Sequence, residues 1–90
     1  MRRKPTGKES QMVYCDFIKA ENNRILYKIG GTVKDITGQL AINPSDNFSF
    51  EVTKQPDNSK VSTRHIEYMI RNNIRSFKEK LYPEKMSYEI

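Results

Sequence analysis

Basic and aromatic side chains recur at helical spacing near the C-terminal end of the chain. Six of them are separated in turn by four, three, four, three and four positions: Arg64, Tyr68, Arg71, Arg75, Lys78 and Tyr82. Residues three or four apart lie on one face of an α-helix, so this spacing predicts a single stripe along a helix. Arginine can bind a phosphate through two parallel hydrogen bonds, and a tyrosine ring can stack on a nucleobase. The chemistry that the stripe favours is therefore contact with nucleic acid.

An ordinary solvent-exposed helix face would explain part of the same pattern. Glu67 lies four positions before Arg71, and Glu79 lies four positions after Arg75, so opposite charges could pair within the helix. Four like charges on one stripe nevertheless repel one another, and folding alone does not require that alignment. Three alternatives follow: a plain solvated face, a nucleic-acid contact, and a contact with an acidic protein or membrane surface.

The rest of the positive charge is concentrated at the start of the chain. The chain holds 16 lysines and arginines against 11 acidic residues. The excess of positive charge comes from residues 1–10 and 62–82, while residues 11–61 carry equal numbers of basic and acidic side chains. Residues 1–10 contain almost no apolar side chain, which predicts a flexible basic arm able to contact a nucleic-acid backbone or minor groove. Its candidate contact residues are Arg2, Arg3 and Lys4. The alternative is a segment that only aids solubility.

Residues suited to catalysis or metal binding are few. His65 and Cys15 are the only histidine and the only cysteine, and no third residue that would orient a catalytic pair can be identified. A soft metal site would need more such ligands. We therefore expect no enzyme activity, no cofactor and no metal. A single cysteine also indicates a reducing compartment, so we expect a cytoplasmic protein, and no apolar run approaches membrane-spanning length.

The elements that must position these residues follow from periodicity and turn chemistry. Alternation predicts strands over residues 11–19, 24–29, 32–42 and 48–54, the third of which could instead be split by a small hairpin at 35–38. In the fourth strand Phe48, Phe50 and Val52 are expected to face the core. Tyr14 and Tyr27, if they share the sheet face opposite the helix, would offer a base-stacking platform or a dimer interface.

A helix is expected to begin at Ser62 or Thr63 and to end before Pro83, because proline disfavours helical geometry in the preceding residue. Its apolar arc comprises Ile66, Met69, Ile70, Ile74, Phe77 and Leu81. Asn73 interrupts that arc, either as an internally hydrogen-bonded residue or as a sign of another contact. Residues 86–90 are expected to add a short edge strand or to pack loosely.

These elements predict an α+β fold in which a four-stranded antiparallel β-meander is packed by one C-terminal amphipathic helix. Residues 11–90 would form a single domain after the flexible basic arm, and its small core would make a homodimer favourable. The function predicted is that of a small non-enzymatic nucleic-acid-binding protein, for DNA or RNA, which contacts phosphates and bases through the helix face and the arm. The alternative is a protein-interaction module, an inhibitor or accessory factor, that docks on an acidic protein partner.

Overall fold

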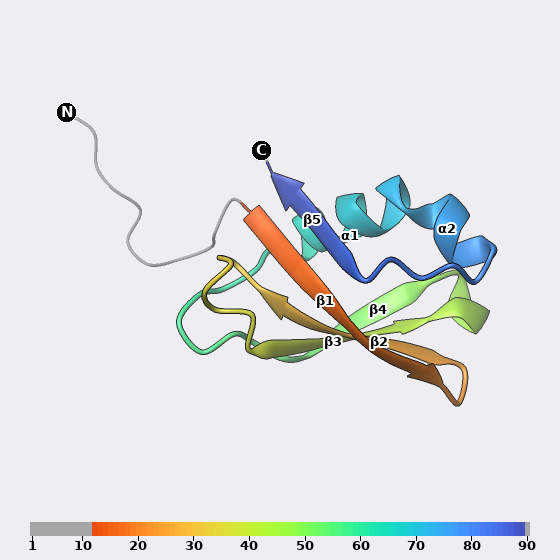
Figure 1. Cartoon of the computed structure of the whole chain (residues 1–90), viewed down its shortest axis with the longest axis horizontal. Helices are drawn as coiled ribbons and strands as arrows, with labels where there is room; N and C mark the ends of the chain where they lie inside the picture. Colours follow the sequence, from red (N-terminus) through yellow and green to blue (C-terminus); the bar gives the residue numbers. More distant parts are fainter. Residues whose placement is uncertain (1–11, 90) are drawn as a thin grey trace.

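The computed structural model describes residues 12–89, in which five antiparallel strands form one sheet in the order β4-β3-β2-β1-β5 (Figure 1). The strands are β1 (Met12–Glu21), β2 (Arg24–Gly30), β3 (Gly38–Asn43), β4 (Ser49–Lys54) and β5 (Lys85–Glu89). A short 3-10 helix, η1 (Pro44–Asp46), joins β3 to β4, and the helices α1 (Thr63–Asn72) and α2 (Ile74–Lys78) lie between β4 and β5. The α+β class with an antiparallel sheet is confirmed, whereas the four-stranded meander with a C-terminal helix is wrong. The predicted basic arm lies outside the described residues.

The strand β5, one of the two alternatives predicted for residues 86–90, runs antiparallel to β1 along the edge of the sheet. Met86 pairs with Cys15 and Tyr88 pairs with Val13. Their side chains face the core, where Met86 is 5% exposed, while the alternate residues of β5 face outward. The Phe17 N–H also donates to the Glu84 carbonyl at 2.8 Å just before the strand begins. Burial of alternate side chains explains why this segment adds a strand instead of packing loosely.

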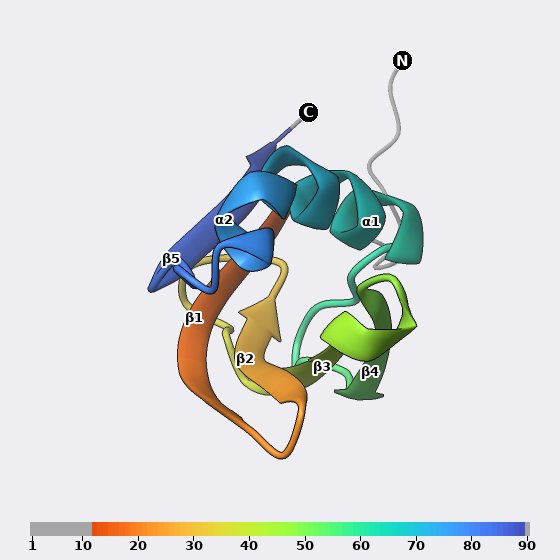
Figure 2. The same cartoon turned by 90° about the vertical axis from the view of Figure 1, so that its right-hand side faces the viewer.

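The sheet curls around the helices, with β1 and β5 on one side of them and η1 and β4 on the other (Figure 2). The residues buried between sheet and helices include Val13, Cys15, Ile25, Tyr27, Ile29, Leu40, Ile42, Ile66, Met69, Ile70 and Phe77. Tyr27 is fully buried, and its hydroxyl donates to the Pro83 carbonyl at 2.6 Å. Tyr14 alternates with the buried residues of β1 and faces the other way. The expectation that Tyr14 and Tyr27 share one outer face is therefore wrong.

The helical segment begins as predicted and then breaks at Asn73. The Ser62 side chain caps α1 by accepting a hydrogen bond from the Arg64 N–H at 3.2 Å. At the break, the Asn73 side-chain amide donates to the Met69 carbonyl at 2.8 Å, and its backbone N–H donates to the Ile70 carbonyl at 3.0 Å. Asn73 is thus hydrogen-bonded internally, the first of its two predicted alternatives.

The end of α2 is set by a left-handed residue rather than by Pro83. Lys80 has a φ of 61°. The Leu81 N–H donates to the Ser76 carbonyl at 2.9 Å and the Lys80 N–H donates to the Phe77 carbonyl at 3.1 Å, the two bonds of a Schellman cap. Because the chain leaves the helix there, Leu81 is 66% exposed, and its predicted place in the apolar arc is wrong. The other five members of the arc are buried or half-buried.

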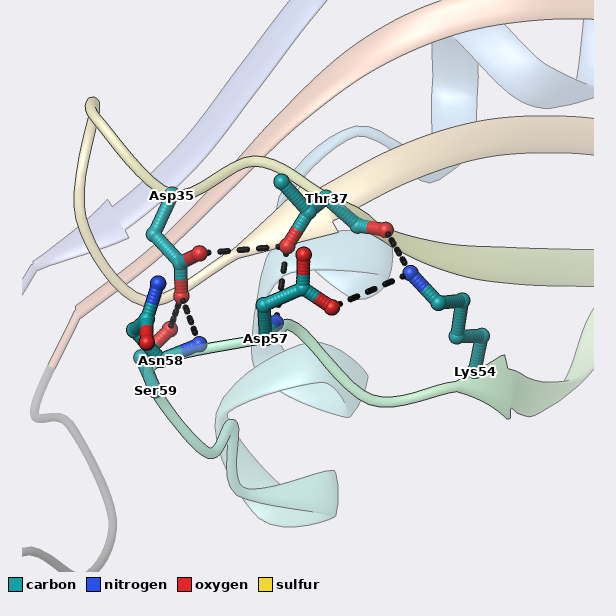
Figure 3. Close-up of polar contacts among 6 residues, drawn as sticks. All are labelled: Asp35, Thr37, Lys54, Asp57, Asn58 and Ser59. Atoms are coloured by element: carbon teal, nitrogen blue, oxygen red, sulfur yellow. Dashed lines mark hydrogen bonds and ion pairs between the residues drawn. The ribbon is translucent and has the colours of Figure 1, made fainter.

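A polar cluster locks the loop after β2 to the loop after β4 (Figure 3). The Asp35 carboxylate, 6% exposed, accepts hydrogen bonds from the Ser59 hydroxyl at 2.6 Å, the Asn58 N–H at 2.9 Å and the Thr37 hydroxyl at 3.1 Å. These hydrogen bonds, that from Ser59 foremost, hold the pKa of Asp35 below its ordinary value against the opposing effect of burial. The Thr37 hydroxyl in turn accepts from the Asp57 N–H at 2.8 Å.

Two glycines allow these loops to approach so closely. A Cβ atom on Gly30 would lie 2.1 Å from the Asp35 carbonyl oxygen, and one on Gly38 would lie 2.5 Å from the Lys54 carbonyl oxygen. Only a residue without a side chain fits at either position. Residues 31–37 therefore form an irregular loop, and β3 begins at Gly38 rather than at the predicted Thr32.

Truncation of Phe77 and of Leu81 should have very different effects on stability. Phe77→Ala removes a buried ring and is expected to cost about 3–5 kcal/mol, whereas Leu81→Ala should change the free energy of unfolding by less than about 0.5 kcal/mol. Urea unfolding followed by circular dichroism measures both. A loss of about 2 kcal/mol or more in Leu81→Ala would mean that the helix continues to that residue and buries it.

Replacement of Asp35 by asparagine should destabilise the protein in a pH-dependent way. A folded-state pKa below the unfolded value means that the carboxylate stabilises the fold above about pH 4, and that this contribution is lost as the pH falls through the folded-state pKa. Asp35→Asn should thus lower stability near neutral pH and differ less from the parent at about pH 3. Asp57→Asn, which removes only an exposed ion pair, is the matched control and should cost less than about 1 kcal/mol. Equal unfolding curves for the two variants would contradict the role of Asp35.

Candidate nucleic-acid interface

The four cations of the predicted stripe are all exposed on the two helices: Arg64 and Arg71 on α1, Arg75 and Lys78 on α2. Arg71 pairs with Glu67 across one helical turn, with 3.1 Å between guanidinium nitrogen and carboxylate oxygen. The side chains of Arg71 and Glu67 are 71% and 51% exposed, so the ion pair contributes less than about 1 kcal/mol to stability. Another anion can therefore readily replace the Glu67 carboxylate beside Arg71. Arg75 forms no ion pair with Glu79 within the described part of the chain.

The two tyrosines of the stripe differ in their surroundings. Tyr68 is 43% exposed, and its ring centroid lies 5.6 Å from that of Tyr88 on β5. Tyr82 lies beyond the end of α2, is half-buried, and stacks on Phe17 with 6.1 Å between ring centroids. The expectation that Tyr82 lies on the helix surface is therefore wrong. One exposed tyrosine remains on the stripe.

A groove runs beside the stripe, between the helices and the strand β4. It has a volume of about 510 Å³ and is lined by Asn47, Phe48, Phe50, Glu67, Ile70, Arg71, Ile74 and Lys78. The lining combines four apolar side chains with two cations, one carboxylate and one amide. Phe50 contributes from β4, Ile70 from α1 and Ile74 from α2, so the groove lies between the edge strand and both helices.

A second groove of about 480 Å³ meets the first at Phe48 and Lys78, which line both. It extends past the end of α2 to the turn between β1 and β2, where Arg24 and Lys80 contribute further cations. The side-chain amide of Asn23 in that turn donates to the Ser45 hydroxyl of η1, which holds the turn against this end of the groove. The two grooves therefore adjoin at Phe48 and Lys78, and together they are called the path beside the helices.

The charge along this path is mainly positive. Arg24, Lys78 and Lys80 form no ion pair among residues 12–89. The two carboxylates that line the path are already paired: Glu67 with Arg71, and Glu21 with Lys19 at 3.1 Å. The path therefore has unpaired cations and no unpaired carboxylate, which suits an anionic ligand.

Phe48, which lines both grooves, has an unfavourable backbone conformation. Asn47 and Phe48 have φ values of 57° and 58°, in the left-handed region. Asparagine tolerates this region, whereas for phenylalanine it costs about 1–2 kcal/mol. The Phe48 ring stacks on Phe77, with 6.1 Å between centroids, which offsets part of that cost. Such strain is often retained where a side chain must keep one position for function.

The sequence did not reveal that Phe48 and Phe50 line a groove. Their alternation with polar residues predicted burial, but both are only half-buried, because β4 is an outer strand of the sheet. The predicted meander already places the fourth strand at an edge of the sheet, but the sequence does not show how the helices lie beside that edge. Arg24 and Lys80 were missed for a similar reason, since each lies outside the helical repeat and joins the path only through the folded turns around it.

The other reactive side chains that the sequence singled out are Cys15 and His65. Cys15 is buried, and burial raises the pKa of its thiol well above the usual range, so the reactive thiolate is rare. His65 is half-buried, with its ring 5.6 Å from that of Tyr88. Within residues 12–89, no group of three or more His, Cys, Asp or Glu side chains could hold a metal ion. Neither helix in that range is long and apolar enough to span a membrane.

Comparison of the chain with protein-family models, with curated proteins and with solved structures gives no match. The surface formed by α1, α2, β4 and the turn between β1 and β2 is therefore interpreted from its own chemistry. Its chemistry consists of exposed cations, half-buried aromatic rings and paired carboxylates.

Proposed function

We propose that the protein is a non-enzymatic nucleic-acid-binding protein that contacts phosphates through the exposed cations of α1 and α2. The observation that carries this proposal is that Arg71 and Lys78 line the same groove as Phe48 and Phe50. Nucleic acid offers both matching groups, phosphates for the cations and planar bases for the rings. The basic segment at residues 1–10, including Arg2, Arg3 and Lys4, would add phosphate contacts of its own.

Binding by this surface requires little rearrangement. The exposed ion pair between Arg71 and Glu67 is weak, so a phosphate can replace the carboxylate at small cost. Arg64, Arg75 and Lys78 are exposed and make no ion pair within the described residues. Each phosphate that a cation neutralises releases condensed counterions, which makes the affinity dependent on salt.

A protein-interaction module that docks on an acidic partner is the second candidate. The apolar residues Ile70 and Ile74 in the groove favour it, because an acidic segment with apolar side chains could occupy the same place. The two candidates differ in their ligands and in salt dependence. A phosphate backbone repeats its charge at every nucleotide, so log affinity should fall with log salt by about 0.7–0.9 for each phosphate contact.

The double variant Arg71→Ala/Arg75→Ala should weaken nucleic-acid binding about tenfold at low salt, because two charge-assisted contacts are lost. The slope of log affinity against log salt should also become shallower by about 0.7–0.9 for each lost contact. Fluorescence polarisation with labelled DNA and RNA across several salt concentrations measures both quantities. The free energy of unfolding should stay within about 1 kcal/mol of the parent, since both side chains are exposed.

The matched control is Lys28→Ala/Lys34→Ala, which removes the same charge from exposed residues of β2 and its following loop. This control should change affinity much less, because it leaves the helix surface intact. Equal losses in the two double variants would mean that net charge alone drives binding. Unchanged affinity in Arg71→Ala/Arg75→Ala, or no binding by the parent at low salt, would contradict the proposed function.

A further inference from the structure

We infer that the path beside α1 and α2 binds single-stranded nucleic acid, with the bases inserted toward Phe48 and Phe50 and the phosphates beside the cations. This inference rests on the proposed function and specifies which strand state the surface binds. Its evidence is the lining of the two adjoining grooves, because exposed cations alone would suit a single strand and a duplex equally. The first observation is that apolar side chains line the first groove together with cations.

Four of the eight residues that line the first groove are apolar: Phe48, Phe50, Ile70 and Ile74. Phe48, Phe50 and Ile74 are half-buried, and Ile70 is 3% exposed, so part of this surface remains open beside the cations. A phosphate backbone alone offers nothing that would cover these apolar side chains. Unstacked bases do, because their planar faces can stack on aromatic rings irrespective of base sequence.

The strand state follows from access to those base faces. In a duplex, each base is stacked between its neighbours, and only its edges are exposed in the grooves. Phe48 and Phe50 lie within a groove and could reach the face of a base only if that base had left the stack. A single strand can turn its bases inward without that cost. The apolar lining thus favours single strands over duplex.

The size and charge of the path agree with this ligand. The two grooves, about 510 and 480 Å³, fall in the range of 300–1,000 Å³ that is usual for sites that enclose small organic groups. Arg71 on α1 and Lys78 on α2 lie on either side of the break at Asn73. Lys80 and Arg24 lie further along the second groove. Cations are thus distributed along the whole path, as the repeating charge of a phosphate backbone requires.

The Phe48 backbone supports the same assignment. A left-handed phenylalanine is unfavourable, yet Phe48, like Lys78, lines both grooves. Its contact with Phe77 prevents the ring from rotating away freely. A ring fixed in this way is preorganised for stacking, so little side-chain entropy is lost on binding.

The test uses a short fluorescent oligodeoxythymidylate, a duplex of the same length, and the full chain carrying Phe50→Leu, Phe50→Tyr or Tyr14→Leu. Phe50→Leu retains an apolar side chain but removes the ring, and should weaken single-strand binding at least about fivefold. Phe50→Tyr, which keeps the ring, should restore affinity to within about twofold of the parent, because stacking does not depend on the hydroxyl. Tyr14→Leu removes a half-buried ring on the opposite face of the sheet and should have no effect. Thermal unfolding of each variant confirms that it is folded.

The outcomes separate the two proposals. Single-strand binding that exceeds duplex binding and is lost in Phe50→Leu but retained in Phe50→Tyr supports the inference. If Arg71→Ala/Arg75→Ala weakens binding while Phe50→Leu does not, or if duplex binds as tightly, the groove assignment is wrong and the proposed function stands. No binding of either nucleic acid contradicts both. Binding instead of an acidic, phenylalanine-containing peptide, with loss in Phe50→Leu, would also overturn the inference and assign the groove to a protein partner.

Discussion

The Phe77 ring packs against the rings of Tyr27, Phe48 and Tyr82, with centroid distances of 6.4, 6.1 and 6.1 Å. Phe77 is the buried residue of the five-residue helix α2, which is too short to be stable without tertiary contacts. This packing therefore fixes α2 over the sheet. Tyr27 extends the same cluster to the C-terminal segment, because its hydroxyl bonds to the Pro83 carbonyl just before β5 begins.

The surface proposed to bind nucleic acid depends on that cluster. With α2 fixed, Lys78 lines both grooves, and so does Phe48 despite its left-handed backbone. The break at Asn73 allows the two helices to follow the curled sheet while their apolar residues remain buried. Core packing and the candidate binding path thus share the same aromatic residues. A change in the core near Phe77 should therefore alter binding as well as stability.

The sequence predicted those features that depend on local patterns. The strands near β1, β2 and β4, the cap at Ser62 and most of the apolar arc follow from alternation, helical spacing and turn chemistry. The helix end was missed, because Lys80 occupies a position where glycine is the usual signal. The strand predicted over residues 32–42 is wrong at residues 32–37, because the contacts of Asp35 with the loop after β4 cannot be seen locally. Five-residue β5 is too short for its pattern to distinguish a strand from a loose end.

The candidate site was predictable in its charge but not in its shape. Helical spacing correctly placed Arg64, Arg71, Arg75 and Lys78 on exposed helix surface. The groove beside them depends on the position of β4 at the edge of the sheet and on the curl that brings η1 toward the helices, which are properties of the whole fold. Tyr82 was misplaced because the path of the chain after the helix decides whether its ring faces solvent or the core.

Backbone amide chemical shifts, recorded by NMR during titration with a short oligodeoxythymidylate, test most directly where the ligand binds. If the path beside the helices is the binding site, the largest changes should fall on Phe48, Phe50, Arg71, Ile74 and Lys78. Residues on the opposite face of the sheet, such as Tyr14, Leu26 and Lys28, should change little. Changes concentrated on that opposite face, or confined to residues 1–10, would contradict the assignment of the groove as the nucleic-acid site.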